Sequence, residues 1–313
     1  MTRETDTPPH GSGPGKQAIT TRERAAAVRA GAQRSERRRR VLLSAGAIVV
    51  VIAVVLALVV VKLTTTTTAN APAAAAPAPA ALAASLAAVP AGTFAQVGAG
   101  SANNPLTPMH GPALTEAGHP LVVYVGANYC PYCAAERWPL AVALSRFGTL
   151  SGLQTTTSAG NDVFPNTATL SFVTVKFTSS VLSFNAVEEQ DREGNPLQTP
   201  TAQQQSLIGT YDVVPGQSGH PIPFVDFGNV FRLSGAQYDP GLLKGLSAAQ
   251  IVGLLGDPGS QVAQAVDGSA NIITAGLCAL TGNAPADVCA SAGVRAGASK
   301  LTGAGSGAGS SSH

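Results

Sequence analysis

In the part of this 313-residue chain whose composition is that of a folded domain, Lys and Arg do not outnumber Asp and Glu. Residues 1–40 hold ten Lys/Arg and four Asp/Glu, whereas the residues after Lys62 hold eight Lys/Arg and thirteen Asp/Glu. The net charge of +2 therefore hides a basic tail and a mildly acidic body. A nucleic-acid-binding domain needs a basic surface on its folded part, so this deficit argues against that class and against a nucleic-acid partner.

The usual spacing of zinc ligands is lacking as well. Cys130 and Cys133 form the single Cys-x-x-Cys of the chain, and ten residues separate the other two cysteines, Cys278 and Cys289. A structural zinc ion takes four ligands, typically from two close pairs of Cys or His. We therefore expect no metal and no cofactor, although a zinc clip on all four cysteines stays an alternative.

One long stretch has no charge at all. Residues 41–61 are rich in Val, Leu, Ile and Ala, and a helix of this length crosses a hydrocarbon core of about 30 Å. Four arginines, residues 37–40, precede it, and the positive-inside rule then predicts a cytoplasmic N-terminus. A cleaved signal peptide is the alternative, but the preceding tail is too long and the apolar run exceeds the usual length. Either topology delivers the cysteines out of the cytoplasm.

These features predict five parts. They are a cytoplasmic, basic, disordered tail (1–40), a transmembrane helix (41–63), a Thr/Ala/Pro-rich linker (64–92), a folded domain (93–301) and a flexible tail (302–313). The linker has no charge, and a segment dominated by Pro and Ala is expected to act as a semi-rigid spacer. The domain shows no internal repeat.

Strand-like and helix-like patterns alternate in the folded domain. They predict a buried strand at 121–128, a helix at 131–147 kinked by Pro139, a strand at 169–177, a helix at 201–212 opened by Thr199 and Pro200, a hairpin at 222–236 around Gly228 and Asn229, and a helix at 246–257 capped by Ser247. This order indicates an α/β fold, a mixed sheet flanked by helices, preceded by one transmembrane helix.

Cys130 and Cys133 lie between the first strand and the first helix. Pro131 suits the first position of a helix, which makes Cys130 the N-cap. Unpaired N–H groups and the helix dipole there favour a thiolate, so the pKa of Cys130 should fall. Cys133, one turn further, is less exposed and close enough to form a disulfide. The pattern predicts Cys130 as nucleophile and Cys133 as the resolving thiol, with an inert disulfide as the alternative.

Four cysteines allow three pairings, and we favour Cys130–Cys133 with Cys278–Cys289. The second pair lies beyond the last helix expected of the fold. We interpret it as a structural disulfide that joins two short helices and pins a C-terminal helical extension, because its spacing is long for a redox pair.

The segments "YVGANYCPYCAAERW" and "GHPIPFVDFGN" resemble the thioredoxin-like superfamily. More narrowly, they are similar to a group of membrane-anchored thioredoxin-like prokaryotic proteins, the domain-of-unknown-function family 929. The resemblance implies that Pro223, after Ile222, is a cis-proline beside the active-site helix that presents backbone to a bound substrate chain. The dipeptide between the cysteines, Pro131 and Tyr132, resembles that of glutaredoxins.

The chain departs from the thioredoxin pattern at several positions. Tyr124 stands where thioredoxins carry a buried acid, Tyr129 replaces the tryptophan before the first cysteine, and Ile222 replaces a threonine. Glu136 is a possible substitute for the acid, but we expect an exposed carboxylate on the helix surface. His220 is a candidate for stabilising the thiolate, with a solvated loop histidine as the alternative.

The sequence thus predicts a membrane-anchored, extracytoplasmic thiol-disulfide oxidoreductase. Its expected partners are client proteins with cysteines, an unidentified membrane redox protein and the lipid bilayer. The main alternative is a non-enzymatic binding or scaffold module of the envelope in which Cys130–Cys133 is a structural disulfide. Thiol-based metal transfer is a third option.

Overall fold

The structure is a computed structural model, and it describes residues 78–216 and 219–301. The described residues lie within one compact unit, Ala73–His313. The predicted tail, transmembrane helix and C-terminal tail lie outside them. The helices are α2 (Pro79–Ala87), α3 (Ala91–Val97), α4 (Pro131–Ser145), α5 (Ala202–Tyr211), α6 (Ala248–Leu255), α7 (Gln261–Leu280), α8 (Ala286–Cys289) and α9 (Ala292–Ala298), with a 3₁₀ turn η1 (Pro240–Leu243).

A mixed sheet forms the centre of the fold, as predicted. Its strands are β1 (Thr107–Pro108), β2 (Thr115–Glu116), β3 (His119–Gly126), β8 (Ser183–Glu188), β9 (Phe224–Phe227) and β10 (Phe231–Ser234). β3 pairs in parallel with β8 and antiparallel with β9, which continues through a hairpin into β10. Asn229 adopts a positive φ of 58° in the hairpin turn, next to Gly228 at 66°, which agrees with the predicted turn.

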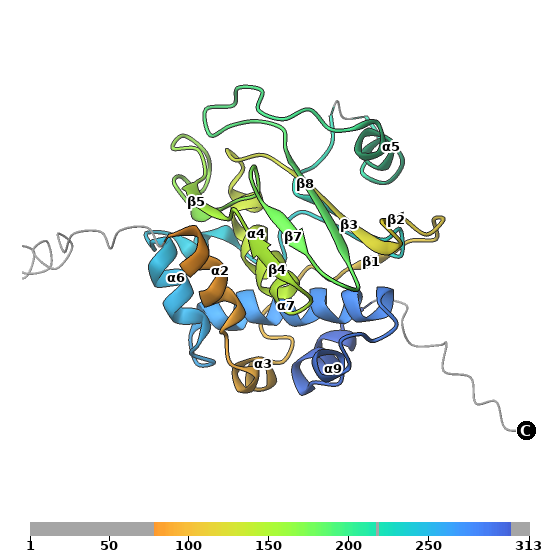
Figure 1. Ribbon diagram of the computed structural model, residues 1–313. Helices are drawn as coiled ribbons and strands as arrows, with labels where there is room; N and C mark the ends of the chain where they lie inside the picture. The colour runs from red at the N-terminus through yellow and green to blue at the C-terminus, as the bar shows by residue number, and fades with distance from the viewer. Residues whose placement is uncertain (1–77, 217–218, 302–313) are drawn as a thin grey trace, which may run out of the picture. The chain divides into compact units, whose positions relative to one another are not determined.

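Alternate residues of β3 face two different apolar layers. Val122 and Tyr124 belong to the large core, which includes α4 and α7, whereas Val123 and Val125 pack on the side of α5. Figure 1 shows α7 along one side of the sheet and α5 on the other. The prediction of a strand buried on both faces is confirmed.

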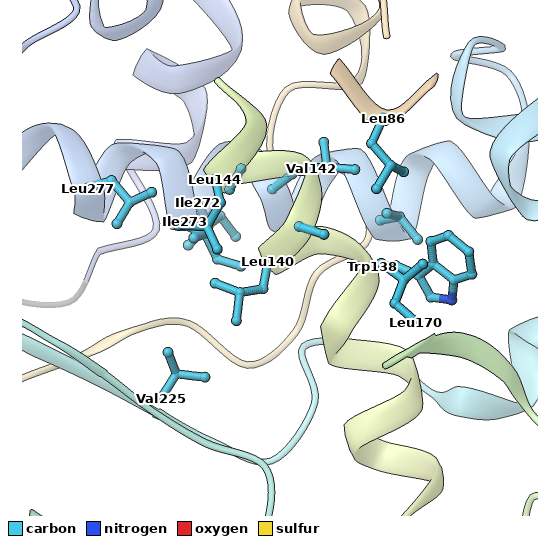
Figure 2. Close-up of a cluster of buried hydrophobic side chains, with 14 of the residues drawn as sticks. Leu86, Trp138, Leu140, Val142, Leu144, Leu170, Val225, Ile272, Ile273 and Leu277 are labelled. Atoms are coloured by element: carbon cyan, nitrogen blue, oxygen red, sulfur yellow. The ribbon is translucent and has the colours of Figure 1, made fainter. Parts of the chain in front are cut away.

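Helix α4 lies at the centre of the large core. Its side chains Leu140 and Leu144 meet Ile272, Ile273 and Leu277 of α7, and Trp138 packs beside Leu170 (Figure 2). Trp138 is fully buried, and its indole N–H donates to the carbonyl of Ala168 at 3.1 Å. The sequence predicted this helix correctly, although it ends at Ser145 rather than at residue 147.

Pro139 does not interrupt α4, which continues on both sides of it. Because Pro139 has no N–H, the carbonyl of Ala135 loses its partner in the helix. The hydroxyl of Tyr238 donates to this carbonyl at 2.7 Å, and the hydroxyl of Thr169 donates to the carbonyl of Ala134 at 2.7 Å. Side chains from outside the helix therefore satisfy the backbone around the proline.

Two predicted elements differ in the structure. The single strand expected at 169–177 is two strands, β6 (Ala168–Ser171) and β7 (Lys176–Thr178), separated by a turn closed from Val175 to Phe172. They pair separately, with β5 (Gln154–Thr157) and β4 (Thr149–Ser151). Alternation alone does not reveal a turn within an apolar run. The helix expected to open at Thr199 and Pro200 is capped by Thr201, which forms a capping box with Gln204.

The described part of the predicted linker is not a semi-rigid spacer but is largely helical and packs on the domain. Leu82 and Leu86 of α2 are buried in the large core, and Thr93, Phe94 and Val97 of α3 are buried as well. Alanine is the strongest helix former, so an Ala-rich segment with leucines four residues apart can form an amphipathic helix once a core accepts the leucines.

Candidate functional site

The loop between β3 and α4 carries the two predicted redox cysteines. Cys130 is the N-cap of α4, and its Sγ accepts the main-chain N–H of Cys133 at 3.2 Å. Pro131 occupies the first helical position, as expected. Both cysteines are free thiols; Cys130 is 5% exposed and Cys133 is fully buried. The local sequence thus builds a helix start in which one sulfur takes the role of a capping oxygen.

The two thiols have opposite electrostatic environments. The pKa of Cys130 is lowered, chiefly by a hydrogen bond from the Cys133 side chain and further by the main-chain N–H of Cys133 and the charge of Arg137, against the opposing effect of burial. The pKa of Cys133 is raised well above its usual value, chiefly by burial and by its interaction with Cys130. Cys130 is therefore the thiol that ionises first.

A second segment reaches the same sulfur. The Ile222–Pro223 peptide bond is cis, and β9 begins directly after it at Phe224. The thiol of Cys130 donates to the carbonyl of Ile222 at 3.7 Å. The fold thus brings together residues 92 positions apart in the chain, Cys130 and Ile222.

Two tyrosines flank Cys130, and a main-chain hydrogen bond from Tyr132 to the Cys130 sulfur helps to lower the pKa of the thiol. Tyr132 is 43% exposed, and its ring meets Phe164 edge to face at a centroid distance of 5.9 Å. Tyr129 is half-buried, its main-chain carbonyl accepts the N–H of Ala159, and burial raises the pKa of its phenol. Tyr129 also lines an open cleft of about 500 Å³ that includes Asp162 and Arg192.

Glu136 is buried, and the expectation of an exposed carboxylate was wrong. Its Oε2 accepts the main-chain N–H of Gln237 at 2.9 Å, whereas Oε1 has no hydrogen-bond partner among the described residues. Burial raises the pKa of Glu136 to about 8. The carboxyl belongs to the packing between α4 and the segment after β10, which sequence spacing could not reveal.

His220 is neither a solvated histidine nor bonded to the cysteines. Its Nε2 lies 3.1 Å from Glu189 Oε2 and its Nδ1 lies 3.3 Å from Asp212 Oδ2. These two carboxylates, Asp212 first, raise the pKa of His220 to about 10. The histidine therefore ties together the chain after β8, the end of α5 and the segment that leads to Pro223.

The sequence reasoning missed an ion pair beneath the cysteines. Arg137 and Glu188 are both fully buried, and the guanidinium donates from Nε and Nη2 to the carboxylate at 2.8 and 2.6 Å. Tyr124 contributes its ring, 5.8 Å from the guanidinium carbon. Arg137, one of two adjacent charges in a helix that is mostly apolar, was the available sign, but nothing in the sequence pairs it with Glu188.

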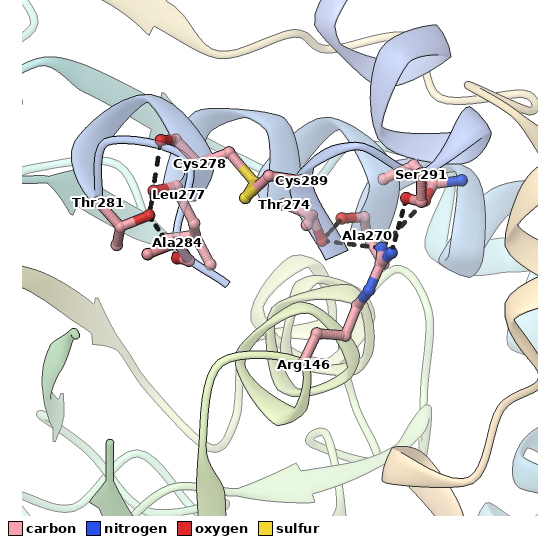
Figure 3. Close-up of a disulfide and its surroundings, with 10 residues drawn as sticks. Arg146, Ala270, Thr274, Leu277, Cys278, Thr281, Ala284, Cys289 and Ser291 are labelled. Carbon is pink, nitrogen blue, oxygen red and sulfur yellow. Dashed lines mark hydrogen bonds between the residues drawn. A yellow bond between two sulfur atoms is a disulfide. The ribbon is translucent and has the colours of Figure 1, made fainter. Parts of the chain in front are cut away.

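Cys278 and Cys289 form a disulfide. It joins α7, a helix of 20 residues, to the short α8, so only one of the two joined helices is short. Beside it, Arg146 donates to Thr274 and Ser291 (Figure 3). The described residues contain no group of three or more His, Cys, Asp or Glu side chains arranged to hold a metal ion. The zinc alternative therefore has no ligand set in this part of the chain.

Within residues 78–216 and 219–301, no single helix is long and apolar enough to cross a membrane, and only the bent pair Ala80–Ala87 and Ala91–Val97 passes by length and composition.

A family model described as a domain of unknown function (DUF929) matches residues 105–279, more than half of the chain. The match includes both site cysteines, the Ile222–Pro223 turn and the buried ion pair. No curated protein and no solved structure matches the chain.

Proposed function

The chain belongs to the family described as a domain of unknown function (DUF929), so its activity has to be argued from its own site, and we propose that it is a thiol-disulfide oxidoreductase. The observation that carries this proposal is the environment of Cys130. Its sulfur lies at the N-terminus of α4, accepts a main-chain N–H and has a lowered pKa, while a second thiol stands one turn away. These are the features of a nucleophilic and a resolving cysteine.

The reaction is an exchange of two electrons between dithiol and disulfide. The Cys130 thiolate attacks a client disulfide; the new bond joins Cys130 to one client sulfur, and the other client sulfur leaves as a thiolate and takes a proton. Cys133 then loses its proton and attacks Cys130, which releases the second client thiol and leaves Cys130–Cys133 oxidised. In reverse, the same steps oxidise a client dithiol.

We further propose a thioredoxin-like fold for the domain. The support is the neighbourhood of Cys130: a parallel and an antiparallel strand on either side of β3, and a cis-proline directly before β9. The carbonyl of Ile222, next to the thiol, is the main-chain group offered to a client segment that lies across Cys130. Ile222 and Pro223 are therefore assigned to substrate contact.

The proposed setting is the extracytoplasmic side of a membrane, with residues 41–63 as the single anchor. Its support is the charge-free run after four arginines and the disulfide Cys278–Cys289, a bond typical of oxidising compartments. A membrane redox protein would restore the dithiol or the disulfide after each turnover.

Trapping of mixed disulfides tests the activity. A Cys133→Ser variant cannot resolve the mixed disulfide, so clients should accumulate on Cys130 in non-reducing gels and be released by reductant. The matched control is Cys130→Ser, which keeps the buried Cys133 and should trap no clients. If Cys133→Ser traps none either, and Cys130–Cys133 resists strong reductant in the wild type, the pair is a structural disulfide and the chain is a binding or scaffold module.

A further inference from the structure

Arg137 is a permanent positive charge in the interior of the domain, close to the cysteine pair. It has no exposed surface. Its Nε and Nη2 groups donate to Glu188, and Nη2 also donates to the carbonyl of Ala127 at 2.7 Å. Burying an ion pair rarely adds stability over apolar packing of the same volume. The charges therefore call for a role other than holding the fold together.

The positions of Arg137 and Cys133 bring the charge to the sulfurs. They stand four residues apart on α4, a spacing that puts two side chains on the same face of a helix, one turn apart. Ala127 lies between them, since its main chain bonds to the Cys133 sulfur and its carbonyl accepts from Arg137. The Nη1 group of Arg137 has no hydrogen-bond partner among the described residues.

Three hydrogen bonds hold the carboxylate of Glu188 in place. Its carboxylate accepts Nε and Nη2 of Arg137 and, at 3.3 Å, the main-chain N–H of Phe172. Of the two charges, Arg137 is the one that lowers the pKa of both cysteines. In a dry interior the effect of a charge on its neighbours is large, because little water screens it.

We propose that Arg137 is a positioning residue of the thiol site, which stabilises negative charge on Cys130 and Cys133 from the buried side and is itself anchored by Glu188. This inference rests on the proposed function and deepens it. Exchange needs a thiolate on Cys130 in the first step and on Cys133 in the second. A fixed guanidinium one turn from Cys133 favours both, without proton transfer to or from the arginine.

The test measures how readily Cys130 ionises. In full-length protein carrying Cys133→Ser, the alkylation rate of Cys130 by iodoacetamide is followed against pH by peptide mass spectrometry. Removing both charges with Arg137→Gln and Glu188→Gln should lower the thiolate fraction at a pH below the pKa by about tenfold. Glu188→Gln alone, which leaves the positive charge unopposed, should raise it. Arg137→Lys keeps the positive charge, so its alkylation rate should stay within about threefold of that of the protein carrying Cys133→Ser alone.

If Arg137 had only a structural role, removing its charge would leave the pH profile of Cys130 alkylation unchanged. Arg146→Gln is the matched control, because Arg146 is a half-buried arginine just beyond α4 that donates to Asn271, Thr274 and Ser291. It should leave the Cys130 profile unchanged. The proposal is overturned if the double variant keeps the parent profile, or if Glu188→Gln lowers the rate as the double variant does. If the double variant does not fold, Glu188→Gln decides: a faster rate supports the proposal, and an equal or slower rate overturns it.

Alkylation requires no client, so this result is independent of whether the chain exchanges disulfides. Trapped clients together with an unchanged profile would refute the role of Arg137 alone. A shifted profile without trapped clients would refute the oxidoreductase and leave the electrostatic effect standing.

Discussion

Glu136 and Arg137 are neighbours on α4, and burial disfavours the charge of both, but only Arg137 has a partner of opposite charge. Glu136 has one main-chain donor and no positive partner, so burial raises its pKa to about 8 and it is mostly protonated at neutral pH. Burial also disfavours the charge of Arg137, but the carboxylate of Glu188 outweighs it and raises the pKa of the guanidinium. At the scale of the residue, a partner decides whether a buried group stays charged.

Replacing Glu136 with Gln should stabilise the fold at alkaline pH and leave it unchanged at acid pH. The carboxyl titrates at about 8 in the folded state and near its ordinary value of 4.5 in the unfolded chain. Between these values the folded state binds more protons, so the wild type loses stability as pH rises from about 4.5 to about 8. Gln mimics the protonated carboxyl and does not titrate. The variant should gain on the order of 3 kcal/mol at pH 8.5 and little at pH 4, measured by urea unfolding.

Asp267 provides the internal control for this experiment. Burial raises its pKa to about 8 as well, and both of its oxygens lack a partner among the described residues. It remains in the Glu136→Gln variant, so the fall in stability with pH should become smaller rather than disappear. Parallel stability curves for variant and wild type would show that Glu136 is ionised in the folded state.

At the scale of the element, packing decides which segments become structure. Helix α4 contains a proline and stays helical because Tyr238 donates to the carbonyl that the proline leaves free. Helix α2 consists mainly of alanine, and two leucines four residues apart attach it to the core. In both cases residues distant in sequence supply what the segment lacks, a hydrogen-bond donor for α4 and apolar neighbours for α2.

Leu86→Ala should destabilise the domain by about 2–4 kcal/mol, since it removes a side chain that is 1% exposed and leaves a cavity beside Val142 (Figure 2). Chemical unfolding of the full-length protein measures the change. Val213→Ala is the control, because the same kind of truncation at a side chain 58% exposed should cost less than about 0.5 kcal/mol. Equal effects of the two variants would mean that α2 behaves as a linker in solution.

At the scale of the whole molecule, the two cysteine pairs differ in what surrounds them. Cys278–Cys289 closes a short loop in the C-terminal extension, which stabilises the fold by about 3 kcal/mol in the chain-entropy model. Cys130 and Cys133 are thiols at the meeting point of β3, α4 and the Ile222–Pro223 turn. One pair closes a loop in the C-terminal extension, and the other consists of two free thiols at the start of α4.

The proposed topology predicts how the cysteines respond to reagents that do not cross membranes. In intact cells, an impermeant reductant followed by an impermeant maleimide should label the full-length chain. Permeabilised cells, the control, should label it to a similar extent. Labelling that appears only after permeabilisation would put the domain in the cytosol and would remove the oxidising setting proposed for it.

Part of the site could be predicted because it depends on neighbouring residues. A strand, a Cys-Pro-Tyr-Cys motif and a helix follow one another directly, so Pro131 at the first helical position and Cys130 as N-cap follow from local rules. The predicted helix at 246–257 had its cap at Ser247 and its end at Gly256, which are the residues observed, for the same reason.

The sequence by itself determined the features that a few adjacent residues specify: where helices start, which strand is buried on both faces, and which thiol stands at a helix end. Only the tertiary structure decided which charges are buried and what pairs with them. Arg137 and Glu188 are 51 residues apart, and Glu136 reaches Gln237 across 101. The cost of burying a charge depends on groups that the folded chain brings together from distant positions, and no local pattern records them.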